Sequence, residues 1–148
     1  MKTVFDPSTL NSLIDRIEKL QAGTSPYWGK MTPYQMVRHC ILSENMYLGY
    51  QQYDRSFIGR LFGKMALKGI LKDEAPMKQN QPTHPTFVIT DAGDLEPVRQ
   101  SWISLLKEYP AAGDTAFADF RHPFFGSMTP KQIGQYVYKH TDHHLRQF

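Results

Sequence analysis

Three histidines near the C-terminus, His140, His143 and His144, are the residues in this chain best suited to chemistry. On a helix each residue turns the side-chain direction by about 100°, and the apolar positions Ile133, Tyr136 and Val137 mark the buried direction. His140 then points within about 10° of that direction and His144 within about 30°, whereas His143 is turned away by about 70°. Two imidazoles one helical turn apart on a buried face can take adjacent positions on a metal ion.

The pair also has an interpretation without metal, because a buried histidine is often only a hydrogen-bonded core residue. Both rings need partners in that case, and neither is easily charged in an apolar interior. A third ligand would favour the metal, and His39 is the candidate. It lies to one side of the main apolar face of its own helix, where it could simply be exposed, or on a second flank that a central bundle helix can bury.

Four long helices are predicted to position these histidines. Each has a capping residue at its start, and three of the four have proline at the first helical position. The apolar residues of the first and third recur with the three-and-four spacing of one helical face. The four helices are predicted over residues 7–21, from Thr32 to about Tyr53, over residues 95–109, and from Thr129 to the C-terminus.

The chain between the second and third long helices is the least regular part. Residues 56–72 allow a shorter helix, although three glycines weaken it by up to about 1 kcal/mol each relative to alanine. Residues 73–90 contain three prolines and are predicted to form a long connection, with a short extended piece near Phe87. A second loop is expected over residues 111–127. Long connections inside a compact domain are often functional.

An internal echo links two of the helix starts. Residues 29–36 and 126–133 share the pattern Gly-x-Met-Thr-Pro-x-Gln-apolar. Helix capping alone explains the Thr, Pro and Gln. A capping box has Thr at the cap and Gln three residues later, and proline is favoured at the first helical position. A pseudo-repeat of two helix pairs is the alternative.

The bulk properties describe an ordinary globular chain. Its 148 residues fit one domain, 1–148, and 41% hydrophobic with 21% charged residues is typical of such a domain. The single cysteine excludes an internal disulfide, and no apolar run suits a signal peptide or a membrane span. The cytoplasm is therefore the expected compartment. The net charge of +3 is too small and too mixed to predict nucleic-acid binding.

Two motifs together resemble a known family. Trp28-x-x-Met31-Thr32-Pro33 leads into His39, and His140-x-x-His143-His144-x-x-Gln147 stands near the C-terminus. This arrangement is similar to the DinB-like superfamily over essentially the whole chain, and residues 121–148 look like one of its uncharacterised branches. The resemblance implies an all-α, up-down-down-up four-helix bundle, with an extra short helix or long connection between helices 2 and 3. It also implies a three-histidine metal site open at one end.

The resemblance assigns the metal ligands to His39, His140 and His144. Related members transfer low-molecular-weight thiols such as bacillithiol or mycothiol, and many have no known activity. Three neutral imidazoles leave a position for water or substrate, and nickel, zinc and iron all suit such ligands. The hypothesis that follows is a thiol S-transferase or hydrolase that activates a thiol or water. Protonation of the ligands predicts metal release below about pH 6.

Several further residues are candidates for supporting roles. Glu44 lies within an otherwise apolar face, where it could accept from a ligand histidine or pair with a buried arginine. His122 and His143 are candidates to face substrate or to support the ligands, although for His122 a surface loop position is favoured. Cys40 is turned about 100° from His39 onto the apolar face, which predicts a buried, unreactive thiol.

A cationic stripe lies in the predicted shorter helix, after the second long helix. Arg60, Lys64, Lys68 and Lys72 recur every four residues beside apolar ones, which favours a solvated face but is also compatible with an anionic surface, an acidic partner or an anionic thiol. Two rival functions remain open. One is a metal-free interaction bundle, and the other is a nucleic-acid binder that uses the stripe. A homodimer is also plausible for this kind of bundle, but no pattern in the sequence identifies a dimer interface.

Overall fold

The structure is a computed structural model that describes residues 1–148, except for the side chains of Asp114 and Thr115. The described chain is mostly helical. Its α-helices are α1 Pro7–Glu18, α2 Pro33–Tyr47, α3 Phe57–Ile70, α4 Leu95–Ala112 and α5 Pro130–Leu145. Two short 3-10 helices, η1 Pro85–Phe87 and η2 Asp114–Phe117, and an antiparallel pair of strands, β1 Arg121–His122 and β2 Gly126–Ser127, complete it.

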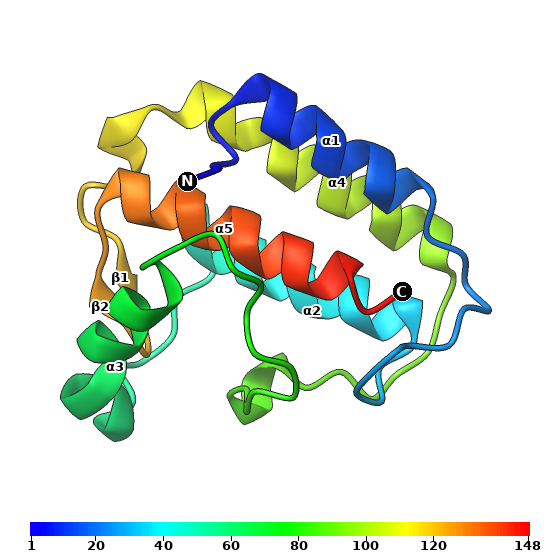
Figure 1. Ribbon diagram of the computed structural model, residues 1–148, viewed down its shortest axis with the longest axis horizontal. Helices are drawn as coiled ribbons and strands as arrows, with labels where there is room; N and C mark the ends of the chain where they lie inside the picture. The colour runs from blue at the N-terminus through cyan, green and yellow to red at the C-terminus, as the bar shows by residue number, and fades with distance from the viewer.

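The four helices α1, α2, α4 and α5 form a bundle, and α3 lies outside it beside the strand pair (Figure 1). Helices α1 and α5 run in one direction, while α2 and α4 run in the other. This is the predicted all-α, up-down-down-up arrangement with an extra helix between the second and third members of the bundle. Helices α2 and α5, which carry the histidines, pack directly against each other.

The helix starts follow the capping chemistry of the sequence. The Asp6 carboxylate accepts from the backbone N–H of Thr9 at 2.8 Å. Thr32 and Thr129 each form a complete capping box with the glutamine three residues later. The internal echo therefore marks two helix starts. The glycines of the echo are explained by backbone conformation, because Gly29 and Gly126 adopt positive φ angles of +78° and +80°, which favour glycine.

Four helix ends differ from the prediction by three or more residues. Helix α1 ends at Glu18 and not at residue 21, and α5 ends at Leu145 and not at the C-terminus. Helix α2 ends at Tyr47 and not near Tyr53, and Gly49 just beyond it has a φ of +83°. A glycine in the left-handed region is a common way to end a helix. Helix α4 continues through Pro110 to Ala112. Proline there removes one N–H donor from the last turn, and the helix ends two residues later.

The irregular regions also differ in part from the prediction. The expected extended piece near Phe87 is the 3-10 helix η1, and the expected loop over residues 111–127 contains η2 and the strand pair. Helix α3 forms despite its glycines. The backbone of Phe124 lies so close to Gly59 and Gly63 that a Cβ at either position would collide with it. Close approach of the strand pair thus explains these two glycines.

The core lies between the four bundle helices. Trp102, Leu106 and Tyr109 of α4 are fully buried against α2, with Met36 and Val37 on the α2 side. At the edge of the bundle, Asp142 of α5 forms an ion pair with Arg16 of α1 at 2.6 Å. Among the described residues, no helix combines the length and apolar character needed to cross a bilayer.

Candidate metal centre

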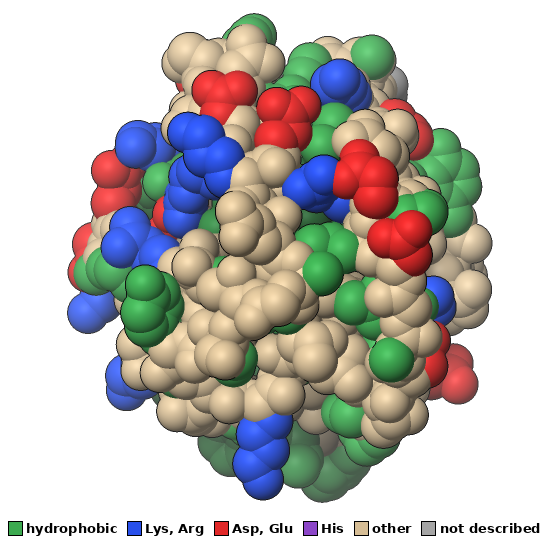
Figure 2. All heavy atoms as spheres, turned by 90° about the vertical axis from the view of Figure 1, so that its right-hand side faces the viewer, with side chains coloured by type: hydrophobic (Ala, Val, Ile, Leu, Met, Phe, Trp, Pro, Cys, Tyr) green, Lys and Arg blue, Asp and Glu red, His purple; other side chains and the backbone are tan. Residues whose placement is uncertain are grey.

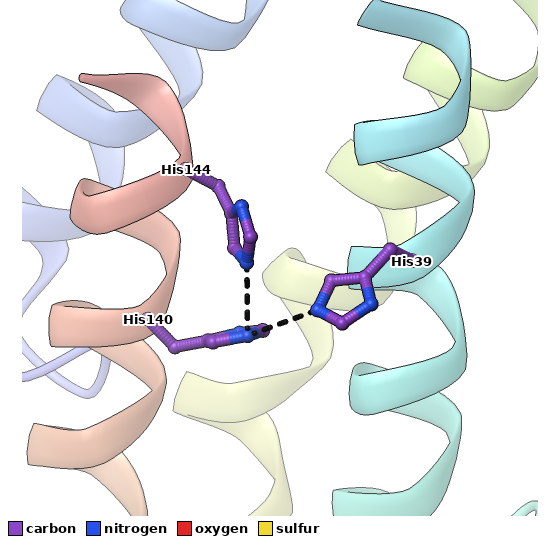
Figure 3. A group of neighbouring side chains, drawn as sticks. All are labelled: His39, His140 and His144. Atoms are coloured by element: carbon purple, nitrogen blue, oxygen red, sulfur yellow. Dashed lines mark hydrogen bonds between the residues drawn. The ribbon is translucent and has the colours of Figure 1, made fainter. Parts of the chain in front are cut away.

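His39 on α2 and the pair His140 and His144 on α5 converge on one point between the two helices (Figure 3). The Nε2 atom of His140 lies 3.3 Å from Nε2 of His39 and 3.2 Å from Nε2 of His144. Their side chains are buried, with relative exposures of 6%, 9% and 7%. The structure therefore brings the three histidines together as a buried triad that can hold a metal ion.

The outer nitrogen of His39 fixes which nitrogen faces the centre. Its Nδ1 lies 2.9 Å from the backbone carbonyl oxygen of Phe87, in η1. A carbonyl oxygen can only accept, so Nδ1 carries the proton and donates. The Nε2 atom of neutral His39 then has a lone pair directed at the centre of the triad. A contact of this kind behind a ligand histidine is the usual support of a metal site.

A chain of two contacts fixes His144 in the same way. The side-chain Nε2 of Gln147 donates to the Trp28 carbonyl oxygen at 3.0 Å, which orients the amide. The amide oxygen of Gln147 therefore faces Nδ1 of His144, 3.0 Å away, and accepts a hydrogen bond from its N–H group. The lone pair on Nε2 of His144 is thus also directed inward.

The donor set suits a first-row divalent ion, and two of its three separations match tetrahedral ligation, while all three donor nitrogens lie within 4.8 Å of one another. Two imidazole nitrogens bound tetrahedrally at about 2.0–2.1 Å from one zinc ion lie about 3.3 Å apart, close to the two separations in the triad. Burial keeps the rings neutral, as metal ligation requires. It lowers the pKa of His39, that of His140 well below its ordinary value and that of His144 to about 3. The neighbouring histidines lower the pKa of His140 further.

Comparison with known families agrees with this arrangement. A protein-family model described as the DinB superfamily matches residues 3–148. The chain belongs to the DinB superfamily. Neither a curated protein nor a solved structure matches it. For a DinB superfamily member the up-down-down-up bundle is expected, and the histidines of the buried triad are those to which the sequence resemblance assigned the metal.

The opening expected at one end of the DinB site is not visible on the end of the bundle where α2 begins and α5 ends. Figure 2 shows that face, and no described histidine side chain is visible in it. Charged side chains gather in its upper part, and its centre is largely uncharged. The connection between α3 and α4 adds a second cover, since it brings Phe87 onto His39 and Met77 beside His143.

Glu44 lies against neither of the partners that the sequence suggested. It is five residues after His39, so its side chain is turned about 140° around α2 and faces α4. The Tyr109 hydroxyl donates to its carboxylate, and Trp102 lies beside it. Burial raises the pKa of Glu44 to about 7, against the opposing effect of Tyr109. Glu44 belongs to a separate buried polar cluster.

His122 is not the surface histidine that its loop position favoured. Its Nδ1 accepts from the backbone N–H groups of Phe124 and Phe125, at 3.0 and 3.2 Å, and so holds the turn between the strands. Burial, and then the nearby charge of Arg55, lower its pKa to about 3. The ring packs on Tyr136, which in turn stacks on His140.

His143 is buried but lies outside the triad. Its ring packs on Trp28 with centroids 5.6 Å apart, and on His144. Its pKa is lowered by burial, partly opposed by a hydrogen bond with the backbone of Met77. This agrees with the rotation that turned it away from the other two histidines. Its geometry suits a supporting position beside the triad.

Two further expectations can be compared with the structure. Cys40 is a free, fully buried cysteine whose pKa burial raises, as expected for an unreactive thiol. The stripe of Arg60, Lys64, Lys68 and Lys72 is exposed to solvent. The Phe87 carbonyl and the role of Gln147 were missed, although Gln147 and Trp28 both stood in the motifs that carried the resemblance.

Proposed function

We propose that the protein binds a divalent metal ion through His39, His140 and His144 and is a metal-dependent enzyme, either a thiol S-transferase or a hydrolase. The observation that supports this most strongly is the pair of fixed tautomers. The Nδ1–H groups of His39 and His144 both donate hydrogen bonds to outer acceptors, so two lone pairs on Nε2 are directed at His140. With neutral rings, at most one proton lies among the three inner nitrogens, whereas a cation satisfies all three.

The ion would supply Lewis acidity, which lowers the pKa of a bound water or thiol toward neutrality. The residues of the chain have three tasks around it. The three imidazoles bind, the Phe87 carbonyl and Gln147 orient two of them, and the stacked ring of Tyr136 holds His140. Burial by the bundle excludes bulk water from the donor atoms.

For the substrate we propose a low-molecular-weight thiol in the cytoplasm, by similarity to the thiol-transferring branch of the superfamily. Nickel, zinc and iron suit three imidazoles equally well. The competing function is a metal-free helical interaction module. In that case His140 would share its single Nε2 proton with the other two rings, which the 3.2 and 3.3 Å separations also allow.

Elemental analysis of protein purified without a histidine tag tests the metal, and a screen of thiols with electrophilic acceptors then tests the reaction. We expect about one equivalent of a divalent metal per chain, and a turnover that is lost on chelation and restored by adding the metal back. Protein that stays metal-free when offered nickel, zinc or iron would support the interaction module. Metal without turnover of any thiol or ester would restrict the proposal to metal binding.

A further inference from the structure

The outward face of α3 is unusually apolar for a solvent-exposed helix. More than half of the exposed large hydrophobic side chains in the described chain belong to it. They are Phe57, Ile58, Leu61, Phe62 and Met65, with relative exposures between 51% and 75%. Single exposed apolar residues are common, but a contiguous group usually marks a surface that something covers. We call these five residues the α3 apolar face.

The packing of α3 directs this face away from the bundle. The opposite side of the helix presents Gly59, Gly63 and Leu67, which are buried. The two glycines lie against the backbone of Phe124, where any side chain would collide. The Ser56 backbone N–H also donates to the Pro123 carbonyl at 3.0 Å. The helix therefore cannot turn its apolar face inward without losing this close contact.

The charge of the same segment is one-sided. Residues 55–72 contain five Lys and Arg and no Asp or Glu, a net charge of +5. Because the whole chain has a net charge of +3, the remaining residues carry −2. A rotation of about 100° per residue places Arg60, Lys64 and Lys68 along one flank of the α3 apolar face. A strongly basic flank beside an apolar stripe is the pattern of a helix that lies in a membrane interface.

We propose that α3 docks on an anionic lipid surface, with the α3 apolar face in the boundary between headgroups and acyl chains and the basic flank among the headgroups. The helix of 14 residues is about 21 Å long and would lie in the plane of the surface, not across it. This proposal is independent of the metal centre, because none of the five apolar residues is a ligand or contacts one through an assigned hydrogen bond.

Charge complementarity selects lipid over a second copy of the chain. A second α3 would bring more positive charge and no acidic residue to the contact. An acidic protein would match the charge, but it would also have to offer an apolar groove beside it. An anionic bilayer presents negative charge and an apolar phase side by side everywhere on its surface.

Vesicle flotation of the full chain tests the proposal. One set of vesicles is phosphatidylcholine alone, and the other is an equal mixture of phosphatidylcholine and phosphatidylglycerol. We expect flotation with the mixed vesicles only, and loss of binding as salt is raised, because the basic flank is screened. Equal flotation with both sets, or with neither, would overturn the proposal.

Two double variants separate the apolar and basic contributions. Phe57→Ser with Leu61→Ser removes apolar area, and Arg60→Gln with Lys68→Gln removes two charges while keeping Lys64, which donates to the Ser127 carbonyl. Each should weaken partitioning into the mixed vesicles on the order of tenfold or more. All substituted side chains are exposed, so the melting temperature and metal content should match wild type.

Matched controls make the same chemical changes elsewhere. Lys107→Gln with Lys131→Gln removes two exposed charges on α4 and α5, and Tyr27→Ser with Val88→Ser removes two exposed apolar side chains. These should float as wild type does. If they lose binding equally, the attraction is general and the assignment to α3 is wrong. If sedimentation instead shows a dimer that only the α3 variants dissociate, the face is an interface between copies and the lipid proposal fails.

Discussion

Helix α2 carries two buried polar regions only five residues apart, and they are built on different principles. At His39 three imidazoles direct their inner nitrogens at one point, and outer acceptors fix two of them. At Glu44 the carboxyl group has a single hydrogen bond, from Tyr109, and its other oxygen has no partner among the described residues. The first region has unused electron pairs for a cation, whereas the second is closed by side chains of the core.

The two regions respond to pH in opposite directions. Burial lowers the histidine pKa values, so the folded state binds fewer protons than the unfolded state below about pH 6.5. Their contribution to stability is complete above that value and is lost as the pH falls toward 3. The pKa of Glu44 is raised to about 7, so its contribution is complete below about pH 4.5 and is lost as the pH rises through 7. The same burial thus penalises acid in one region and alkali in the other.

The largest difference between the two regions is expected in metal affinity, and His140→Ala should reveal it because this ring is the central member of the triad. The affinity for added zinc or nickel should fall by more than about a hundredfold, which isothermal titration measures. The metal should also no longer raise the melting temperature. His143→Ala on the same helix is the matched control and should retain metal. Equal affinity of wild type and His140→Ala would refute the ligand assignment.

The substitution Glu44→Gln tests the other region, since glutamine imitates the protonated carboxyl group. A pKa raised from 4.5 to about 7 corresponds to roughly 3 kcal/mol of stability lost at high pH. Chemical denaturation at pH 8 should show the variant more stable than wild type by up to this amount, and at pH 4 nearly equal to it. A variant less stable than wild type at pH 8 would show that the ionised carboxylate is needed. Metal affinity should not change.

The substitution Gln147→Leu removes the acceptor behind His144 while leaving all three ligands in place. Loss of such a contact usually weakens metal binding by about tenfold to a hundredfold. Titration of the apo-protein with zinc would measure the loss, and Gln81→Leu, at an exposed glutamine, serves as the control. If Gln147→Leu binds zinc as tightly as wild type, the tautomer of His144 does not depend on this amide.

The smallest effect is expected from Tyr109→Phe, which removes the hydrogen bond that Glu44 accepts from the Tyr109 hydroxyl. We expect a loss of about 1–2 kcal/mol in the free energy of unfolding at neutral pH. The pKa of Glu44 should rise further, because the hydroxyl favours the ionised form. Stability profiles across pH would then show the decline at higher pH than in wild type. A decline at lower pH would contradict the assigned direction of that hydrogen bond.

The bundle and the inward direction of His140 and His144 could be predicted from sequence because their signals are local, whereas His39 was assigned to the same site by the family resemblance. Thr32 and Thr129 begin helices through chemistry contained within four residues, and the inward direction of His140 and His144 follows from rotation alone. The early end of α2 also had a local signal in Gly49, which the prediction passed over.

The remaining contacts depend on pairings that no local pattern encodes. Every residue has a backbone carbonyl, so nothing in the sequence marks that of Phe87 as the partner of His39, 48 residues away. The outward direction of the α3 apolar face was equally hidden, because it depends on Gly59 and Gly63 meeting Phe124. The separation of Glu44 from His39, in contrast, follows from sequence alone, because five residues turn the side chain by about 140° around the helix.

The two tryptophans of the chain divide between these regions. Trp28 packs on His143 at the edge of the triad, and Trp102 lies fully buried beside Glu44. Each region therefore has its own fluorophore. In the Trp102→Phe variant, the fluorescence of Trp28 should change when metal binds to the histidines. In the Trp28→Phe variant, the fluorescence of Trp102 should change when the Glu44 carboxyl group gains or loses its proton. Intrinsic tryptophan fluorescence can thus monitor each of the two buried polar regions of α2 separately, without an added label.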